Sequence, residues 1–178
     1  MKKIFQIGVF FLLTISLCGC NSLSRQTMYV LDDDNISFSL PKRWEQVDTN
    51  ENDLALTKDS ADLSMSAYHQ SDLDGMTSKE LLKKKIEENT KEMESHRIIK
   101  NYKVNETQDR IIHSTLYSGT KNEVETQYFA SVVEFKGSHT YVYVLYEAKE
   151  MYMKYNIDDI QRIILRMKWN GGEDLALK

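Results

Sequence analysis

The sequence predicts an α+β protein in which an antiparallel β-sheet is flanked by helices. Three observations predict this fold class. Residues 36–40 alternate strictly between apolar and polar side chains, which is typical of a strand with one buried face. Residues 128–135 and 140–146 are adjacent runs rich in β-branched and aromatic residues. Residues 153–167 carry apolar side chains at helical spacing, which predicts a helix that packs on a sheet.

The chain begins with a segment that predicts secretion. Lys2 and Lys3 form a short positive start, and residues 4–17 are almost wholly apolar. This apolar run is shorter than the ~20 residues that a membrane-spanning helix needs. A charged start, a short apolar middle and a small-residue exit are typical of a signal peptide. We therefore expect a signal peptide over residues 1–19.

Residues 17–20, Leu-Cys-Gly-Cys, resemble the lipobox of bacterial lipoproteins. The resemblance implies cleavage before Cys20 and attachment of lipid to the Cys20 sulfur. Acyl chains would then hold the protein on the membrane, because each buried CH₂ contributes about 0.8 kcal/mol. The expected location is the extracytoplasmic face of the cell membrane, or the periplasmic or outer-membrane side in a two-membrane envelope. An ordinary secretory signal with an incidental cysteine is the alternative.

Charge and cysteine content narrow the classes of partner. The 178 residues include 23 basic and 27 acidic side chains, a net charge of −4. Loss of residues 1–19 removes two lysines and leaves 21 basic and 27 acidic residues, a net charge of −6. An acidic chain without a basic stripe argues against nucleic acid and against electrostatic adhesion to anionic lipid. Cys20 becomes the only cysteine after cleavage, so no disulfide is expected.

The first part of the predicted domain is a strand meander. A turn is expected at 32–35, because the contiguous acids there lack the spacing of a calcium loop. The strand at 36–40 ends at Pro41, which has no N–H for a sheet ladder. Two further short strands are expected at 54–56 and 63–67.

The first helix of the domain begins with a capping box. Thr77 is followed three residues later by Glu80, a spacing in which each side chain satisfies a backbone N–H of the first turn. Leu82, Ile86 and Met93 then form a narrow apolar stripe. The narrow stripe predicts a helix on the surface of the fold, with a solvated outer side.

Strands return after this helix. They are expected at 98–108, 111–118, 124–135 and 140–146, with turns at 119–122 and 136–138. The last two strands are apolar or aromatic on both faces. We therefore expect them at the centre of the sheet, covered on both sides.

The last helix has the broadest apolar stripe in the chain. Asn156 is the expected N-cap of its main part, and Gly171-Gly172 is expected to end it. The stripe consists of Met153, Ile157, Ile160, Ile163, Ile164 and Met167. One globular domain is thus predicted at 29–170, between a polar tether at 20–28 and a flexible tail at 171–178.

The order of these elements, with the opening run Ile36-Ser-Phe-Ser-Leu-Pro-Lys-Arg-Trp44, resembles the PsbP/DcrB-like family. That family begins with an aromatic-containing strand, a proline and a tryptophan soon after it, and the resemblance extends over most of residues 29–169. It implies an α/β/α sandwich around an antiparallel sheet. It also implies non-catalytic roles, as accessory subunits or as modules that bind partners or chaperones, and it transfers no catalytic residue.

No recognisable catalytic motif is present. The sequence contains no nucleophile elbow, no phosphate-binding glycine loop and no C-x-x-C, and no cofactor is expected. None of the histidines is spaced as a helical zinc pair, and each is expected at the surface or at a sheet edge. A hydrolase with a dispersed site is the alternative, because His113 or His139 could meet a carboxylate in the fold. The four histidines are His69, His96, His113 and His139.

Tyrosines near the C-terminus form the candidate interaction surface. Tyrosine is enriched at interfaces because it is amphipathic. Tyr141 and Tyr143 share one face of a predicted strand, and Tyr152 and Tyr155 follow in the last helix. The alternative is that these rings simply fill the space between sheet and helix.

These observations predict a non-enzymatic lipoprotein that acts as a protein-binding or assembly-accessory module. The membrane would be reached through the lipid on Cys20, and a protein partner is expected, whereas nucleic acid is not. A protein that binds a small molecule or a cell-wall fragment through the tyrosine-lined sheet face is the second hypothesis. The hydrolase is the third.

Overall fold

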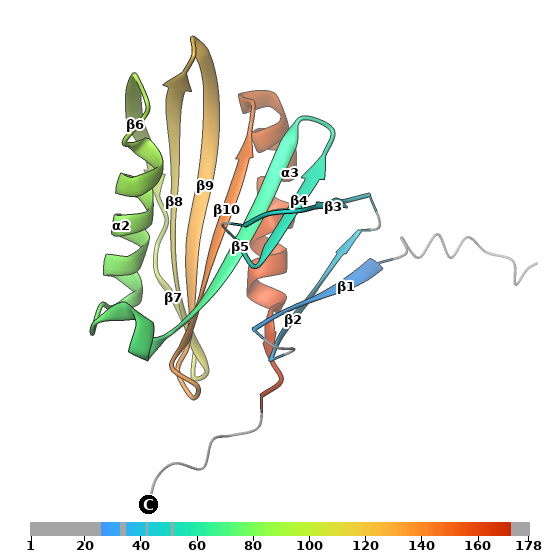
Figure 1. The fold of residues 1–178 in the computed structure, drawn as a ribbon, viewed down its shortest axis with the longest axis vertical. Coiled ribbons are helices and arrows are strands. Elements are labelled where there is room, and N and C mark those ends of the chain that lie inside the picture. Colours follow the sequence, from blue (N-terminus) through green and yellow to red (C-terminus); the bar gives the residue numbers. More distant parts are fainter. Residues whose placement is uncertain (1–25, 33–34, 42, 51, 172–178) are drawn as a thin grey trace, which may run out of the picture.

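The structure is a computed structural model that describes residues 26–32, 35–41, 43–50 and 52–171. The predicted signal peptide, Cys20 and residues 172–178 lie outside the described residues. The large antiparallel sheet has the strand order β3-β4-β5-β10-β9-β8-β6, and β7 also pairs with β8 (Figure 1). Its strands are β3 (Glu45–Val47), β4 (Leu54–Lys58), β5 (Ala61–His69), β6 (Ser95–Asn101), β7 (Asn105–Glu106), β8 (Arg110–Lys121), β9 (Val124–Phe135) and β10 (Thr140–Ala148).

A small antiparallel sheet and two α-helices complete the described part of the domain. The small sheet has the order β1-β2-β11. Its strands are β1 (Gln26–Leu31), β2 (Ile36–Pro41) and β11 (Lys168–Trp169). The helices are the 3₁₀ turn η1 (Gln70–Leu73), α2 (Ser78–Thr90) and α3 (Glu150–Arg166).

The two α-helices cover opposite faces of the large sheet. Successive residues of a strand point to opposite faces. Tyr141 and Tyr143 of β10 pack in one buried cluster with residues of α2. Val142 and Val144 pack in the other cluster with residues of α3. The predicted α+β fold, with helices on both faces of an antiparallel sheet, is therefore confirmed, and β9 and β10 lie at the sheet centre as predicted.

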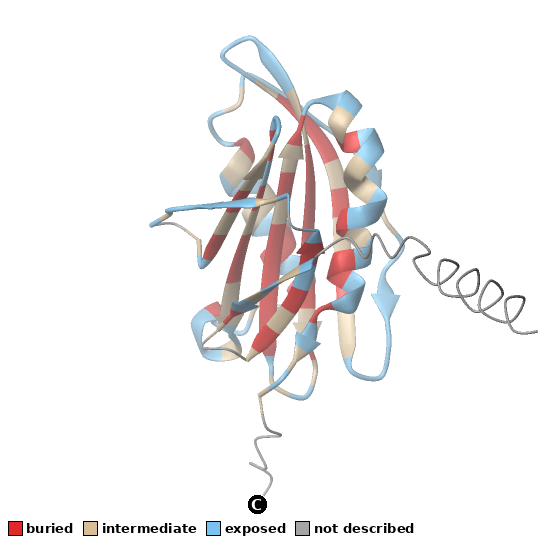
Figure 2. Cartoon of the chain, turned by 90° about the vertical axis from the view of Figure 1, so that its right-hand side faces the viewer, coloured by how far each residue is buried: buried red, intermediate tan, exposed pale blue. Residues whose placement is uncertain are grey.

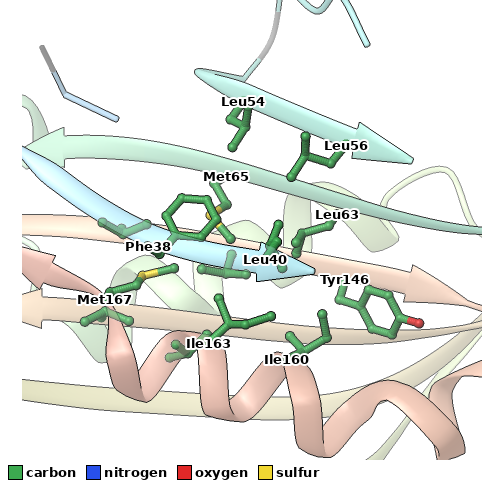
Figure 3. Close-up of a cluster of buried hydrophobic side chains, with 14 of the residues drawn as sticks. Phe38, Leu40, Leu54, Leu56, Leu63, Met65, Tyr146, Ile160, Ile163 and Met167 are labelled. Carbon is green, nitrogen blue, oxygen red and sulfur yellow. The ribbon is translucent and has the colours of Figure 1, made fainter. Parts of the chain in front are cut away.

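The larger buried cluster lies between the large sheet, α3 and the small sheet (Figure 3). Phe38 and Leu40 of β2 point into it, while Ile160 of α3 enters from the helix side. Figure 2 shows that buried residues concentrate in the middle of the sheet and that the outer side of the helices is exposed. The alternation that predicted β2 thus has its expected cause, since the apolar side chains of this strand enter the core and Ser39 is exposed.

The chain is ordered into strand earlier than the sequence predicted. β1 begins at Gln26, so it overlaps the last three residues of the predicted tether. The strand forms because Leu31 enters the core and Tyr29 stacks on Phe38, with 5.7 Å between the ring centroids. The strand predicted at 98–108 is also divided, into β6 and β7.

The turn predicted at 119–122 is displaced toward the C-terminus. The hairpin turn lies at Asn122 and Glu123, whose φ values of 51° and 65° match the left-handed conformation of two-residue hairpin loops. Gly119 instead belongs to β8, where a Cβ atom would come within 2.1 Å of the Met93 Sδ atom. The glycine therefore allows Met93 to pack closely on the strand and does not form the turn.

The last helix is longer at its start than predicted. α3 begins at Glu150, after Lys149 as N-cap, and ends at Arg166. Asn156 is not a cap but an interior residue, and its side-chain amide donates a hydrogen bond of 2.8 Å to the Tyr152 carbonyl oxygen. Burial of Met153 in the core explains the early start, because it places the preceding turn against the sheet.

Candidate functional site

Tyr141 and Tyr143 are core residues. Their exposed fractions are 3% and 6%, and both rings lie between the large sheet and α2. The prediction that these two rings belong to an exposed interaction surface is therefore wrong, and the alternative of space-filling between sheet and helix holds for them. Tyr141 and Tyr143 therefore cannot form the exposed sheet face through which a small molecule or cell-wall fragment was expected to bind.

Tyr152 and Tyr155 lie on α3, on the opposite side of the sheet from Tyr141 and Tyr143. Tyr152 is half-buried against the larger core, whereas Tyr155 is 76% exposed. The four tyrosines consequently do not form one surface, and Tyr155 alone projects fully into solvent.

The buried hydroxyl of Tyr143 allows a stability prediction. It has no hydrogen-bond partner among the described residues, and burial raises the pKa of Tyr143 well above its ordinary value. We expect Tyr143→Phe to raise the free energy of unfolding by about 1 kcal/mol, because an unpaired buried polar group costs about 1–3 kcal/mol. Urea unfolding followed by circular dichroism measures the change.

Tyr117→Phe is the matched control for this prediction. The Asn89 side-chain amide donates a 2.7 Å hydrogen bond to the Tyr117 hydroxyl, and Tyr117 is fully buried. Its loss should lower the free energy of unfolding by about 1 kcal/mol. Equal destabilisation by both substitutions would contradict the assignment of an unpaired Tyr143 hydroxyl.

The four histidines lie on different segments, and His69 and His139 are neighbours, because the His139 carbonyl oxygen accepts a 3.0 Å hydrogen bond from the Gln70 backbone N–H. His69 lies 2.9 Å from the Asp32 carboxylate through its Nε2 atom, a contact between segments 37 residues apart. His113 is half-buried, and burial lowers its pKa. His96 and His139 are exposed, the latter in the β9–β10 turn.

No cluster of three potential metal-binding side chains is found in the described ranges. The described part of the chain also contains no helix with the length and apolar character needed to cross a membrane. Two surface grooves are candidate sites because each is lined by exposed side chains that could contact a ligand.

The first is the α2–β6 groove, an open cavity of about 490 Å³ between α2 and the edge of the large sheet. Leu82, Ile86, Ile98 and Val104 give it an apolar lining. Ile98 and Val104 are 48% and 45% exposed. The other lining residues are Lys79, Lys83, Glu87, Asn101, Tyr102, His113, Ser114 and Thr115.

The α2–β6 groove lies beside an unpaired strand edge. β6 and β7 follow one another along the same edge of β8, and all residues of β6 are exposed. β6 pairs only with β8 among the described strands, so its outer backbone groups face no neighbouring strand. A bulge between Ile98 and Lys100 interrupts the register. Such an edge can accept an added strand, although the bulge makes the ladder irregular.

The second is the basic groove, a cavity of about 630 Å³ between the small sheet and the C-terminal half of α3. Four cationic side chains and one carboxylate line it. They are Arg110, Arg162, Arg166, Lys168 and Asp159. Gln26, Met28, Ser37, Phe38, Ser39, Pro41, Ile163, Leu165 and Met167 complete the lining.

Arg110 holds the end of α3 at the basic groove. Its Nη1 atom donates to the Met167 carbonyl at 2.7 Å and to the Leu165 carbonyl at 3.4 Å. The guanidinium also pairs with Asp109 and lowers the pKa of that carboxyl to about 2. Arg110 therefore neutralises the carbonyl-bearing, negative end of the helix.

The sequence alone did not indicate either groove. The basic groove joins Arg110 to residues more than 50 positions later in the chain, and the α2–β6 groove joins a helix to a strand in which every residue is exposed. Clusters of lysine and arginine at 162–168 and the paired isoleucines at 98 and 99 are the local signals that could have pointed to them.

The sequence matches no protein-family model and no curated protein. The fold is similar to cyanobacterial PsbP (CyanoP) from Synechocystis sp. PCC 6803, with a TM-score of 0.63 and 13% identity over 85% of this chain and 96% of that one. It is also similar to the Ran-binding protein Mog1p from Saccharomyces cerevisiae, with a TM-score of 0.57 and 7% identity over 82% and 96% of the two chains.

A third similar structure is LpqN from Mycobacterium tuberculosis, which is described as involved in cell envelope biogenesis. Its TM-score is 0.57, with 10% identity over 83% of this chain and 91% of that one. At these identities the likeness shows a PsbP-like fold and nothing about the residues of a site.

Proposed function

We propose that this chain is a lipid-anchored, extracytoplasmic accessory module of the cell envelope, without enzymatic activity, that binds a segment of a protein partner in the α2–β6 groove. The observation that carries the proposal is the exposed apolar lining of this groove beside the unpaired edge of β6. Exposed apolar surface next to a free strand edge is typical of sites that bind an extended peptide.

The chemistry of the groove favours an extended segment with apolar and acidic side chains. The apolar side chains of such a segment would contact Ile86 and Ile98, and its backbone would pair with β6. Lys79 and Lys83 stand at the rim on α2, and Lys79 forms no ion pair with a described residue. Carboxylates of the partner would therefore meet cations at this rim.

The similar proteins support this class of function. Mog1p is described as a Ran-binding protein, and LpqN is described as involved in cell envelope biogenesis. A partner-binding role in the envelope is consistent with both descriptions. The lipobox at residues 17–20 supports the anchor.

A photo-crosslinking amino acid at Ile98 tests the partner site in intact cells. We expect a discrete protein adduct that is absent when the crosslinker replaces Val47, which is 42% exposed on β3 at the opposite sheet edge. The partner identified from the adduct should then bind the purified protein, and Ile98→Lys should weaken that binding at least tenfold whereas Val47→Lys should not. Equal crosslinking at both edges would contradict the assignment.

Acyl labelling tests the anchor. We expect Cys20→Ala to abolish incorporation of a labelled fatty acid and to leave the precursor uncleaved. Cys18→Ala is the matched control, because the adjacent cysteine precedes the cleavage site and should leave labelling and processing intact. Continued labelling of the Cys20→Ala protein would exclude lipid attachment at this residue.

A further inference from the structure

The basic groove contains two cations that form no ion pair among the described residues. Arg110 is committed to the end of α3 and to Asp109, and Arg162 pairs with Asp159 at 3.0 Å. Arg166 and Lys168 are exposed and form no ion pair with any described residue. Because Arg110 already neutralises the helix end, the positive charge of these two side chains is available to a ligand.

The groove also combines charge with exposed apolar side chains. Met28 of β1 is 71% exposed and Leu165 of α3 is 50% exposed, and both line the cavity. The hydroxyl-bearing residues Ser37 and Ser39 line it from β2. Arginine and lysine bind phosphate through charge-assisted hydrogen bonds, and apolar side chains beside them are typical of surfaces that enter the headgroup region of a membrane.

The position of the groove in the chain indicates where its ligand comes from. Gln26 and Met28 line the groove, and Gln26 follows Cys20 by six residues. Six residues span at most about 21 Å even when fully extended. If Cys20 carries lipid, as proposed above, the groove is held within this distance of the membrane surface.

We infer that the basic groove binds the phosphate of anionic lipid headgroups in the membrane to which the chain is anchored. This inference rests on the proposed lipid anchor and adds an orientation to it. The net charge of the whole chain does not set the potential of a local cluster: an anionic membrane repels the rest of an acidic surface and attracts this face. The small sheet and the end of α3 then face the lipid, and the α2–β6 groove on the other side of the large sheet stays open to a partner.

Fluorescence of the lipidated full-length protein in vesicles tests this orientation. Mass spectrometry first verifies the acyl group. The substitution Met28→Cys then introduces a site for an environment-sensitive fluorophore into the mature chain, and Val124→Cys in the β8–β9 hairpin, where Val124 is 51% exposed, provides the control position. The label at position 28 should shift to the blue in vesicles with 30% phosphatidylglycerol but not in pure phosphatidylcholine. The label at 124 should respond in neither.

Charge reversal in the groove should remove this response. Each lysine or arginine near an anionic surface contributes about a factor of five to binding. Arg166→Glu with Lys168→Glu should therefore lower the ratio of headgroup-bound to free orientation by about 25-fold or more. The matched pair Lys84→Glu on α2 with Lys91→Glu at its C-cap makes the same change in net charge and should keep the response. A salt concentration of about 0.5 M should also suppress it.

The possible results distinguish a failure of the lipid anchor from a failure of the proposed orientation. A protein without an acyl group would overturn the proposed anchor and the orientation together. An acylated protein whose label at 28 responds equally to both lipids, or whose response survives Arg166→Glu with Lys168→Glu, would overturn the orientation alone. Competition by 10 mM glycerol 3-phosphate at constant ionic strength would show that the groove prefers a free phosphate ester, which would also overturn the lipid assignment.

Discussion

Replacing Phe129 by alanine should lower the free energy of unfolding by about 3–5 kcal/mol. Phe129 is fully buried in the centre of β9, and its ring meets Tyr102 edge to face with 5.5 Å between the centroids. The substitution removes apolar contacts, leaves a cavity in the larger core and abolishes this aromatic pair. Domains of this size are stable by about 5–15 kcal/mol, so the loss is a large share of the total.

Urea unfolding followed by circular dichroism measures this effect. Val124→Ala is the control on the same strand, because Val124 is 51% exposed and its truncation should change the free energy by no more than about 0.5 kcal/mol. A loss below 1 kcal/mol for Phe129→Ala would show that β9 does not occupy the centre of a packed core.

Replacing Leu81 by alanine should lower the free energy of unfolding by about 2–5 kcal/mol. Leu81 is 2% exposed and packs in the smaller cluster between α2 and the sheet. The apolar face of α2 is narrow, so a single leucine contributes a large part of its attachment. The helix itself should persist, since alanine has the highest helix propensity.

Lys84→Ala on the exposed side of α2 is the matched control and should change stability by less than about 0.5 kcal/mol. The same urea experiment, with hydrogen exchange to locate the change, separates loss of packing from loss of helix. If Leu81→Ala and Lys84→Ala behaved alike, α2 would not be docked through Leu81.

The periodicity of apolar residues was enough to predict the fold class. The alternation in β2 and the helical stripe of α3 both have their expected causes in the larger core, and the capping box of Thr77 and Glu80 is present, with the Glu80 carboxylate accepting from the Thr77 backbone at 2.8 Å. Each of these signals lies within one short segment of sequence. Such signals predicted the structure correctly where a strand or helix buries one face and exposes the other.

The prediction failed where a segment lacks such a face or where tertiary packing overrides a local preference. β3 was missed because all its residues are exposed, so its sequence carries no alternation. Asn156 is a good cap by residue type, but Met153 draws the helix start into the core. For the tyrosines, the two apolar faces of β10 correctly predicted a strand covered on both sides, and it is this cover, supplied by α2, that buries Tyr141 and Tyr143. The interaction surface was predicted from residue type alone and was inconsistent with that cover.

The two candidate grooves could not be predicted from local sequence signals, because each is formed by separate segments of the chain. The basic groove depends on Arg110 reaching the carbonyl of Met167, a contact between β8 and the end of α3. The α2–β6 groove depends on how far α2 stands from the sheet edge. Lipid attachment at Cys20 remains a prediction from the lipobox, and the acyl-labelling experiment tests it.

The bulge in β6 has a consequence for solubility. A regular exposed edge strand with two adjacent isoleucines would let identical copies pair edge to edge and grow into fibres. The extra residue between Ile98 and Lys100 bends and twists this edge. The free N–H and C=O groups of β6 are therefore not evenly spaced, and a second copy could not pair with them along the whole strand. Deleting Ile99 should restore a regular ladder along this edge, and the variant should then pair edge to edge with a second copy more readily than the natural chain, which size-exclusion chromatography measures.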